Sequence, residues 1–173
     1  EITPEQLGGA EVHDRVSGTA HFVANNDEEC IQMVKRLLSY LPSNNSELPP
    51  SVQTDDAPDR IDDSLAGLVP ADPRRPYDIQ EVLVRVVDKG ELFEVFPQFA
   101  RNLITAFARL NGRSVGVLAN QPKVFAGVLD IDASDKASRF IRFCDAFNIP
   151  LVTFVDVPGY MPGKNQEHGG IIR

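Results

Sequence analysis

The part of this chain best suited to chemistry is the loop that follows an apolar run near its C-terminal end. Residues 151–155 read Leu-Val-Thr-Phe-Val, and Asp156 ends this run, after which Pro and Gly recur as far as Gly170. In open α/β sheets, ligands bind just beyond the carboxyl ends of the strands. Glycine-rich turns can also present backbone N–H groups that stabilise oxyanions without any acid or base side chain. The loop is therefore the first candidate for a binding site, with a purely structural turn as the alternative.

Conventional catalytic side chains do not form recognisable patterns. The sequence has no HExxH, no CxxC pair, no Walker loop and no GxGxxG motif. Its histidines lie far apart and lack ligand spacing, so we predict no metal site in this chain. Three neighbouring aspartates fall where a helix is predicted to begin, and we expect them to cap it and complement its dipole. The histidines are His13, His21 and His168, and the aspartates are Asp130, Asp132 and Asp135.

The composition argues against some classes of partner. The chain has 173 residues, a formal net charge of −8 and 42% hydrophobic residues, which fits a globular domain. Nucleic acids and anionic membrane surfaces are bound mainly by Lys and Arg, so the acidic balance argues against both. No apolar run approaches the length of roughly 20 residues that spans a bilayer. Cys30 and Cys144 lie in apolar helical patterns, which predicts two buried, reduced thiols in a reducing compartment.

The elements that position the C-terminal loop are a predicted hairpin, a helix and a strand. Asn111-Gly112 lies between the β-rich runs 102–110 and 113–119 and is a strong hairpin signal. The run 151–155 is nearly all apolar, which predicts a parallel strand buried on both faces. A strand–helix–strand order implies that this strand pairs in parallel with the second hairpin strand through a right-handed crossover.

Capping residues mark the predicted helix starts. Thr3-Pro-Glu-Gln6 is a capping box with Pro at the first helical position. Asn26 and Asp78 precede apolar patterns of helical spacing, and a further helix is predicted to follow Asp132 or Ser134. The remaining predictions are short strands at 21–24 and 92–96 and the start of a helix at 169–173.

Residues 42–76 differ in composition from the rest of the chain. Seven Pro residues are interleaved with Ser, Asn and Asp, and few residues are apolar. This pattern predicts a linker or a long surface excursion, and therefore a domain boundary.

Long runs of the sequence resemble a known family. The run NQPKVFAGVLDIDASDKASRFIRFCDAFNIPLVTFVDVPGYMPGKNQEHGGIIR is similar to the opening of the C-terminal domain of biotin-dependent acyl-CoA carboxyltransferases. The resemblance continues through LGGAEVHDRVSGTAHFVANNDEE, YDIQEVLVRVVDKGELFEV and ARLNGRSVGVLANQP, and it covers nearly the whole chain except roughly residues 46–70.

The resemblance implies an α/β fold of the crotonase-like (ClpP/crotonase superfamily) class. The chain would span the end of one carboxyltransferase domain and the start of the next. Residues 1–45 would end the N-terminal domain, 46–76 would be the Pro-rich linker, and 77–173 would begin the C-terminal domain. We expect the natural chain to continue past Arg173, because the last residues resemble a helix start without its body.

The resemblance also implies a reaction and its participants. A carboxyl group would move between carboxybiotin and an acyl-CoA of the propionyl-CoA or methylmalonyl-CoA type, with biotin carried on a separate protein or domain. The partners would be a biotin carboxyl carrier and biotin carboxylase or decarboxylase subunits, and full-length subunits would form a hexamer. The location would be cytoplasmic, or the mitochondrial matrix in a eukaryote.

The resemblance assigns no catalytic residue in this chain. Two oxyanion-binding turns typical of the family, one similar to Ala-Gly-Gly-Ala and one to Tyr-Gly-Gly-Ala, are absent, so we expect this stretch alone to be inactive. Gly169-Gly170 matches a family segment near the biotin side of the site. A non-catalytic α/β module that binds CoA or a partner protein remains the alternative. The residues that the resemblance implies as lining the site are Val157, Pro158, Gly159, Gly169 and Gly170.

Overall fold

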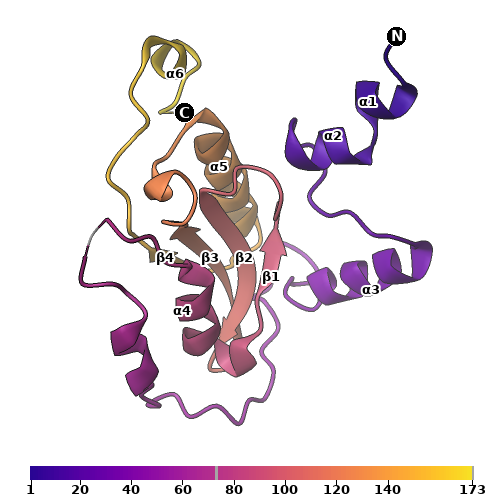
Figure 1. The fold of residues 1–173 in the computed structure, drawn as a ribbon. Coiled ribbons are helices and arrows are strands. Elements are labelled where there is room, and N and C mark those ends of the chain that lie inside the picture. The colour runs from indigo at the N-terminus through magenta and orange to yellow at the C-terminus, as the bar shows by residue number, and fades with distance from the viewer. Residues whose placement is uncertain (73, 173) are drawn as a thin grey trace.

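The computed structural model describes residues 1–72 and 74–172, and its centre is a four-stranded mixed sheet (Figure 1). The strand order is β1-β2-β3-β4. Neighbouring strands are antiparallel except for β3 and β4, which run parallel with Gly116 opposite Leu151 and Ala119 opposite Phe154. The predicted hairpin and the predicted parallel pair are both confirmed. The strands are β1 (Phe93–Val95), β2 (Leu103–Leu110), β3 (Arg113–Asn120) and β4 (Leu151–Phe154).

The helices begin where side chains can accept the free N–H groups of their first turns. The Thr3 capping box is present, Asn26 accepts from the Glu29 N–H, and Asp78 accepts from the Gln80 N–H. The helix predicted after Asp132 or Ser134 begins earlier, because its N-cap is Asp130. The helices are α1 (Pro4–Gly8), α2 (Ala10–Arg15), α3 (Asp27–Leu38), α4 (Ile79–Val86), α5 (Ile131–Ala146) and α6 (Lys164–His168), with 3-10 turns at Asp63–Gly67, Asp88–Gly90 and Phe125–Gly127.

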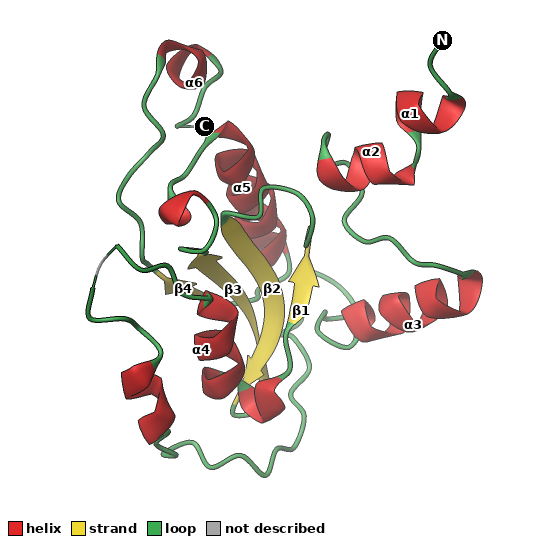
Figure 2. Cartoon of the chain, viewed as in Figure 1, coloured by secondary structure: helices red, strands yellow, loops and turns green. Residues whose placement is uncertain are grey.

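Two helices cover the two faces of the sheet (Figure 2). Ile79 and Leu83 of α4 pack with Ile104 and its neighbours on one face, and Phe140 and Cys144 of α5 pack on the other. Side chains along β2 and β3 point alternately to the two faces of the sheet, so each strand contributes to both cores. Gly116 lets α5 approach closely, because a Cβ atom there would lie 2.7 Å from the Cys144 Sγ atom. Because β3 and β4 are parallel neighbours, their carboxyl ends lie side by side at the same end of the sheet.

Two burial predictions are wrong. The strand β4 is not buried on both faces, and Val155, just beyond it, is 73% exposed. Within the described part of the chain β4 is the last strand of the sheet, so a single neighbour covers it. Cys30 is exposed, whereas Cys144 is buried as predicted, and burial raises the pKa of the Cys144 thiol to about 12. Ile31, Val34 and Leu38 of the same apolar stripe are also exposed, whereas Leu37 packs against the core of the sheet.

Two element predictions are also wrong. Residues 21–24 form no strand, although the His21 carbonyl oxygen accepts a hydrogen bond from the Phe96 N–H at 3.0 Å. The helix near the C-terminal end precedes the Gly pair instead of starting at it, since α6 ends at His168. Ile171 is buried beyond it, and Arg173 lies outside the described residues.

The described residues of the Pro-rich stretch 42–76 include the 3-10 turn Asp63–Gly67. Hydrogen bonds tether this stretch to the rest of the chain at several points, two of which lie near the hairpin turn and at the end of α4. The Val52 N–H donates to the Gly112 carbonyl oxygen at 2.9 Å. The Arg60 guanidinium donates to the carbonyl oxygens of Arg85, Val86 and Val87 at the end of α4, at 2.6, 2.9 and 2.9 Å, which suits a cation because helix C-termini are negative. The division into 1–45, 46–76 and 77–173 stays a prediction.

Candidate functional site

A cavity of about 480 Å³ lies at the carboxyl ends of β3 and β4. Three segments far apart in the sequence form it: the end of the Pro-rich stretch, the loop after β3 and the loop after β4. Its walls combine prolines and aliphatic groups with two arginines, one tyrosine and two aspartates. The lining residues are Val69, Pro70, Asp72, Arg74, Arg75, Pro76, Tyr77, Pro122, Ala126, Asp156, Val157 and Pro158.

The two strand-end loops are held together by Asn120, the last residue of β3. Its Nδ2 group donates to the Gly127 carbonyl oxygen at 3.1 Å, and its Oδ1 atom accepts from the Asp156 N–H at 3.3 Å. The loops approach so closely that a Cβ atom on Gly127 would lie 2.7 Å from the Asp156 carbonyl oxygen. Gly127, with φ of 74°, is therefore required both for its conformation and for its size.

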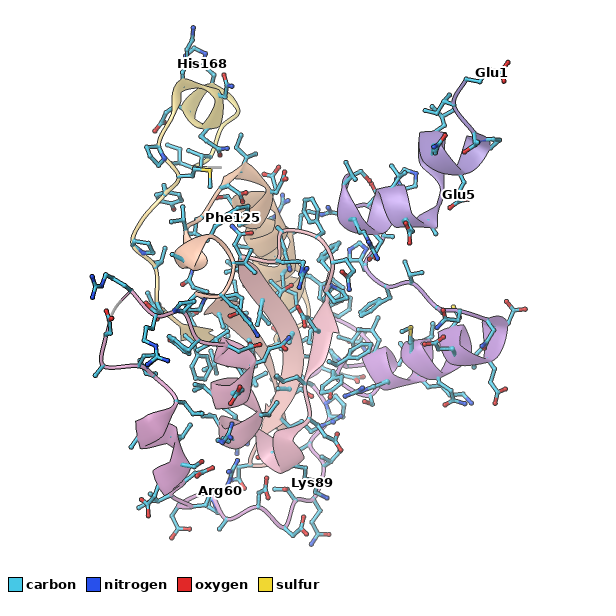
Figure 3. The ribbon with its side chains drawn as sticks, viewed as in Figure 1. Glu1, Glu5, Arg60, Lys89, Phe125 and His168 are labelled. Carbon is cyan, nitrogen blue, oxygen red and sulfur yellow. The ribbon has the colours of Figure 1, made fainter. Side chains whose placement is uncertain are left out.

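The loop after β3 contains a strained turn that sequence reasoning missed. Phe125 and Ala126 have φ of 49° and 52°, the left-handed region that residues other than glycine rarely occupy. Phe125 is 65% exposed and lies at one end of the sheet (Figure 3), next to Ala126, which lines the cavity. Backbone strain of this kind persists where the surrounding structure enforces it and gathers at functional sites. The only local signal was Gly127 itself, shortly after a strand.

Tyr77 and Asp156 form a polar contact in the wall of the cavity. The Tyr77 hydroxyl donates to the Asp156 Oδ2 atom at 2.7 Å. Burial and this carboxylate together raise the pKa of Tyr77 to about 12, so the phenol stays protonated at neutral pH. The positive side of the cavity comes from Arg74 and Arg75, of which Arg74 pairs with Asp72 at 3.1 Å. The cavity can thus offer donors to an anionic group beside an apolar wall.

The structure places the five predicted site residues in two groups. Val157 and Pro158 line the cavity, and the Gly159 carbonyl oxygen next to them accepts from the Leu129 N–H at 3.1 Å. The Gly pair lies beyond α6 instead. A Cβ atom on Gly169 would lie 2.2 Å from the Ile131 Cδ1 atom at the start of α5, and Gly170 has φ of 82°.

Residues 112–116 form a GxSxG pattern, but this pattern is not a nucleophile elbow. Such an elbow places its Ser on a sharp turn between a strand and a helix. Ser114 lies inside β3, is buried, and its hydroxyl bonds to the Pro50 carbonyl oxygen at 3.4 Å. It is a strand residue without a base beside it.

Residues 1–72 and 74–172 contain neither a cluster of metal-ligating side chains nor a membrane-spanning helix. No three His, Cys, Asp or Glu side chains in that part of the chain are grouped as metal ligands. No helix there has the length and apolar character needed to cross a membrane.

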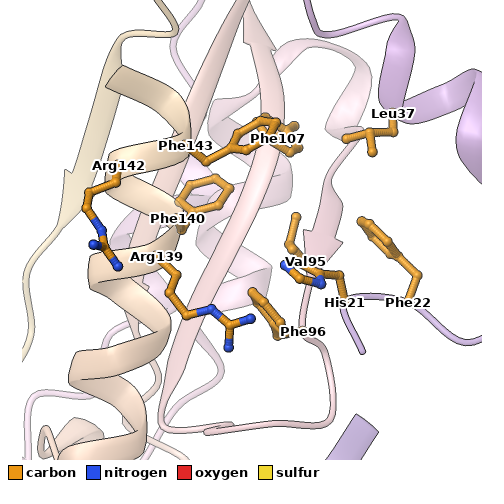
Figure 4. Close-up of a pocket in the computed structure, with 10 residues that line it drawn as sticks. All are labelled: His21, Phe22, Leu37, Val95, Phe96, Phe107, Arg139, Phe140, Arg142 and Phe143. Atoms are coloured by element: carbon orange, nitrogen blue, oxygen red, sulfur yellow. The ribbon is translucent and has the colours of Figure 1, made fainter. Parts of the chain in front are cut away.

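A larger cavity of about 610 Å³ lies between α5, β1 and the N-terminal segment (Figure 4). Its walls are mostly aromatic, and Arg139 crosses it to donate to the Gly18 carbonyl oxygen at 2.8 Å and to lie over the Phe96 ring at 5.1 Å. Burial, together with Arg139, lowers the pKa of His21. This cavity offers apolar contact but no strand-end turns, so we place the candidate site in the smaller cavity.

The comparison with known proteins decides the family. A model of the carboxyl transferase domain matches residues 1–173. This chain belongs to the carboxyl transferase domain family. It is 60% identical over its whole length to methylmalonyl-CoA decarboxylase subunit alpha of Veillonella parvula, and 54% identical to the propionyl-CoA carboxylase carboxyltransferase subunit of Haloferax mediterranei, covering 34% of each.

A solved structure has the same fold over nearly the whole chain. The transcarboxylase 12S structure described with methylmalonyl-CoA and methylmalonic acid bound matches with a TM-score of 0.96 and 50% identity over 99% of this chain and 33% of that one. The fold is therefore the mixed α/β, crotonase-like fold of the carboxyltransferases, as the sequence resemblance implied. The chain spans about a third of the length of the relatives it matches.

Proposed function

We propose that the full-length protein containing this chain moves a carboxyl group between carboxybiotin and an acyl-CoA of the propionyl-CoA and methylmalonyl-CoA type. The observation that carries this proposal is the TM-score of 0.96 at 50% identity to a transcarboxylase subunit described with methylmalonyl-CoA bound. The names of the two sequence relatives support the same substrate class.

The geometry of the candidate site supports this chemistry. Carboxyl transfer passes through negative charge on the thioester oxygen and on the ureido oxygen of biotin, and preorganised donors stabilise such charge. The cavity combines an apolar wall, formed by Pro122, Val157 and Pro158, with the guanidinium of Arg75. This donor set fits a flat, apolar bicycle that carries a carboxyl group, and biotin when bound supplies the ureido nitrogen that carries it. Our proposal assigns the lining of this cavity to Val157 and Pro158 with the adjacent Gly159, and it assigns Gly169 and Gly170, which lie beyond α6, to a separate part of the site in the full-length protein.

The partners follow from the same proposal. Biotin would reside on a biotin carboxyl carrier, and a biotin carboxylase or a decarboxylase subunit would exchange carboxyl groups with it. The hexamer named for the transcarboxylase 12S structure supports a homo-oligomer of full-length subunits. We retain the cytoplasm, or the mitochondrial matrix of a eukaryote, as the predicted location.

The decisive experiment uses the full-length subunit with its biotinylated carrier. Methylmalonyl-CoA labelled with ¹⁴C in the free carboxyl group is added, and radioactivity on the carrier is measured after avidin capture. We expect label on the biotinylated carrier and none on carrier produced without biotin. Binding of CoA without transfer of label to the carrier, with methylmalonyl-CoA and malonyl-CoA alike, would overturn the proposal in favour of a non-catalytic binding module.

A further inference from the structure

A lysine is buried at the end of the sheet where the candidate site lies. Lys136, on α5, has an exposed fraction of 0%. Its Nζ group donates to the carbonyl oxygens of Phe96, Phe99 and Leu103 at 2.9, 2.8 and 2.7 Å, with Ala100 further away at 3.4 Å. An ammonium group has three donors, and each has a short acceptor, two in the β1–β2 loop and one at Leu103, the first residue of β2. The loop is therefore wrapped around one cation.

The charge of Lys136 has a geometric consequence. Burial lowers the pKa of Lys136 to about 8, and the Glu94 carboxylate acts against this shift, so the ammonium form prevails at neutral pH. Buried charges are costly, and a well-packed apolar side chain would often be as stable. What the cation adds is a defined loop conformation, in which Phe96 and Ala100 have φ of 56° and 44°. Such conformations persist only where surrounding contacts enforce them.

Asn102 connects this loop to the candidate site. It is 1% exposed and adjoins Leu103. The Asn102 Nδ2 group donates to the Val128 carbonyl oxygen at 2.7 Å and to the Asp130 Oδ1 atom at 3.2 Å. The main-chain carbonyl oxygen of Asn102 accepts from the Gln121 N–H at 2.9 Å. These contacts hold both ends of the β3–α5 connection, which carries the strained Phe125–Gly127 turn. Figure 1 shows this connection and the β1–β2 loop at the same end of the sheet.

We propose that Lys136 is a positioning residue, which acts through the β1–β2 loop and Asn102 to set the Phe125–Gly127 turn at the candidate site. Lys136 does not line the cavity, so its effect on a reaction is indirect. The inference about catalysis rests on the proposed carboxyl transfer, whereas the inference about the turn rests on the hydrogen bonds alone.

The test compares K136M with T105V in the full-length subunit. Methionine keeps the length of the side chain and removes its donors. Thr105 is a matched control, because it is buried in β2 and donates to the Val95 carbonyl oxygen at 2.8 Å without holding the loop. We expect both variants to lower Tm. Only K136M should lower kcat for carboxyl transfer, by roughly 100-fold, because a displacement of about 1 Å at a reacting centre costs that much. KM for the acyl-CoA should change less than threefold.

A second readout separates this proposal from the proposed function. Amide hydrogen exchange of segment 121–130 should accelerate in K136M and remain unchanged in T105V, whether or not the wild type transfers carboxyl groups. Should K136M fail to assemble, N102A is compared with T105V instead, because Asn102 connects the same loop to segment 121–130. Unchanged exchange of 121–130, or an equal loss of kcat in T105V, would overturn the positioning role. An inactive wild type with accelerated exchange in K136M would overturn the carboxyl transfer and leave the positioning of the turn supported.

Discussion

Replacing Gly127 by alanine tests whether the contact between the two strand-end loops sets the candidate site. In G127A the new Cβ atom would lie 2.7 Å from the Asp156 carbonyl oxygen and 3.3 Å from the Asn120 Cβ atom. Carbon and oxygen atoms that are not bonded normally approach to about 3.3 Å. The loop after β4 must therefore move by several tenths of an ångström, and it carries Val157 and Pro158 with it.

The magnitude has two contributions. An alanine in the left-handed region costs about 1–2 kcal/mol relative to glycine. Overpacking by one methyl group costs about 1–3 kcal/mol. We expect a total loss of roughly 3 kcal/mol in the free energy of unfolding. If the proposed carboxyl transfer uses this site, kcat should fall by about 10- to 100-fold, because a displaced loop misplaces the reacting groups.

The assay is Tm together with steady-state kinetics of the full-length subunit. The matched control is G67A, because no atom lies within 4 Å of a Cβ atom at Gly67, so its Tm and kcat should equal those of the wild type. A wild-type Tm in G127A would refute the packing argument. A lowered Tm with unchanged kcat would show that the two loops touch but do not form the reacting site.

Three further predictions concern the same structure. Y77F removes the hydrogen bond to Asp156. The pKa of Tyr77 is raised to about 12, above its ordinary value near 10. The protonated phenol therefore stabilises the folded protein below pH 10, and this stabilisation is lost as pH rises towards 12. The wild type should therefore lose more Tm than Y77F over that interval, and equal losses would contradict the assignment. G116A should lower Tm, because its methyl group would lie 2.7 Å from the Cys144 Sγ atom. Adding C144A to G116A should restore part of this loss, and a double-mutant cycle would measure the restored part as non-additivity. Cys144 is buried and its pKa is about 12, so its thiol should not react with iodoacetamide at pH 8 in the native protein. Peptide mapping measures this labelling, and rapid labelling of Cys144 would show that α5 opens.

Local signals determined most of the secondary structure. Asn111-Gly112 specified the hairpin because few residues other than Asn and Gly occupy the left-handed conformations that it needs. Thr3, Asn26 and Asp78 marked helix starts because their side chains satisfy N–H groups only two or three residues away. The long runs of family-like sequence likewise carried the fold class, since they extend over nearly the whole chain.

Tertiary contacts decided which surfaces are buried and what lies at the site. The apolar patterns of Cys30 and of β4 predicted burial, but exposure depends on which segments cover them, and no pattern within a segment encodes that. The hydrogen bond between Tyr77 and Asp156 joins residues that are 79 positions apart in the sequence. The strain at Phe125 and Ala126 is invisible locally, because their side chains carry no preference for a left-handed backbone. The surrounding packing and hydrogen bonds impose it, among them those of Asn120, and only the folded chain brings them together.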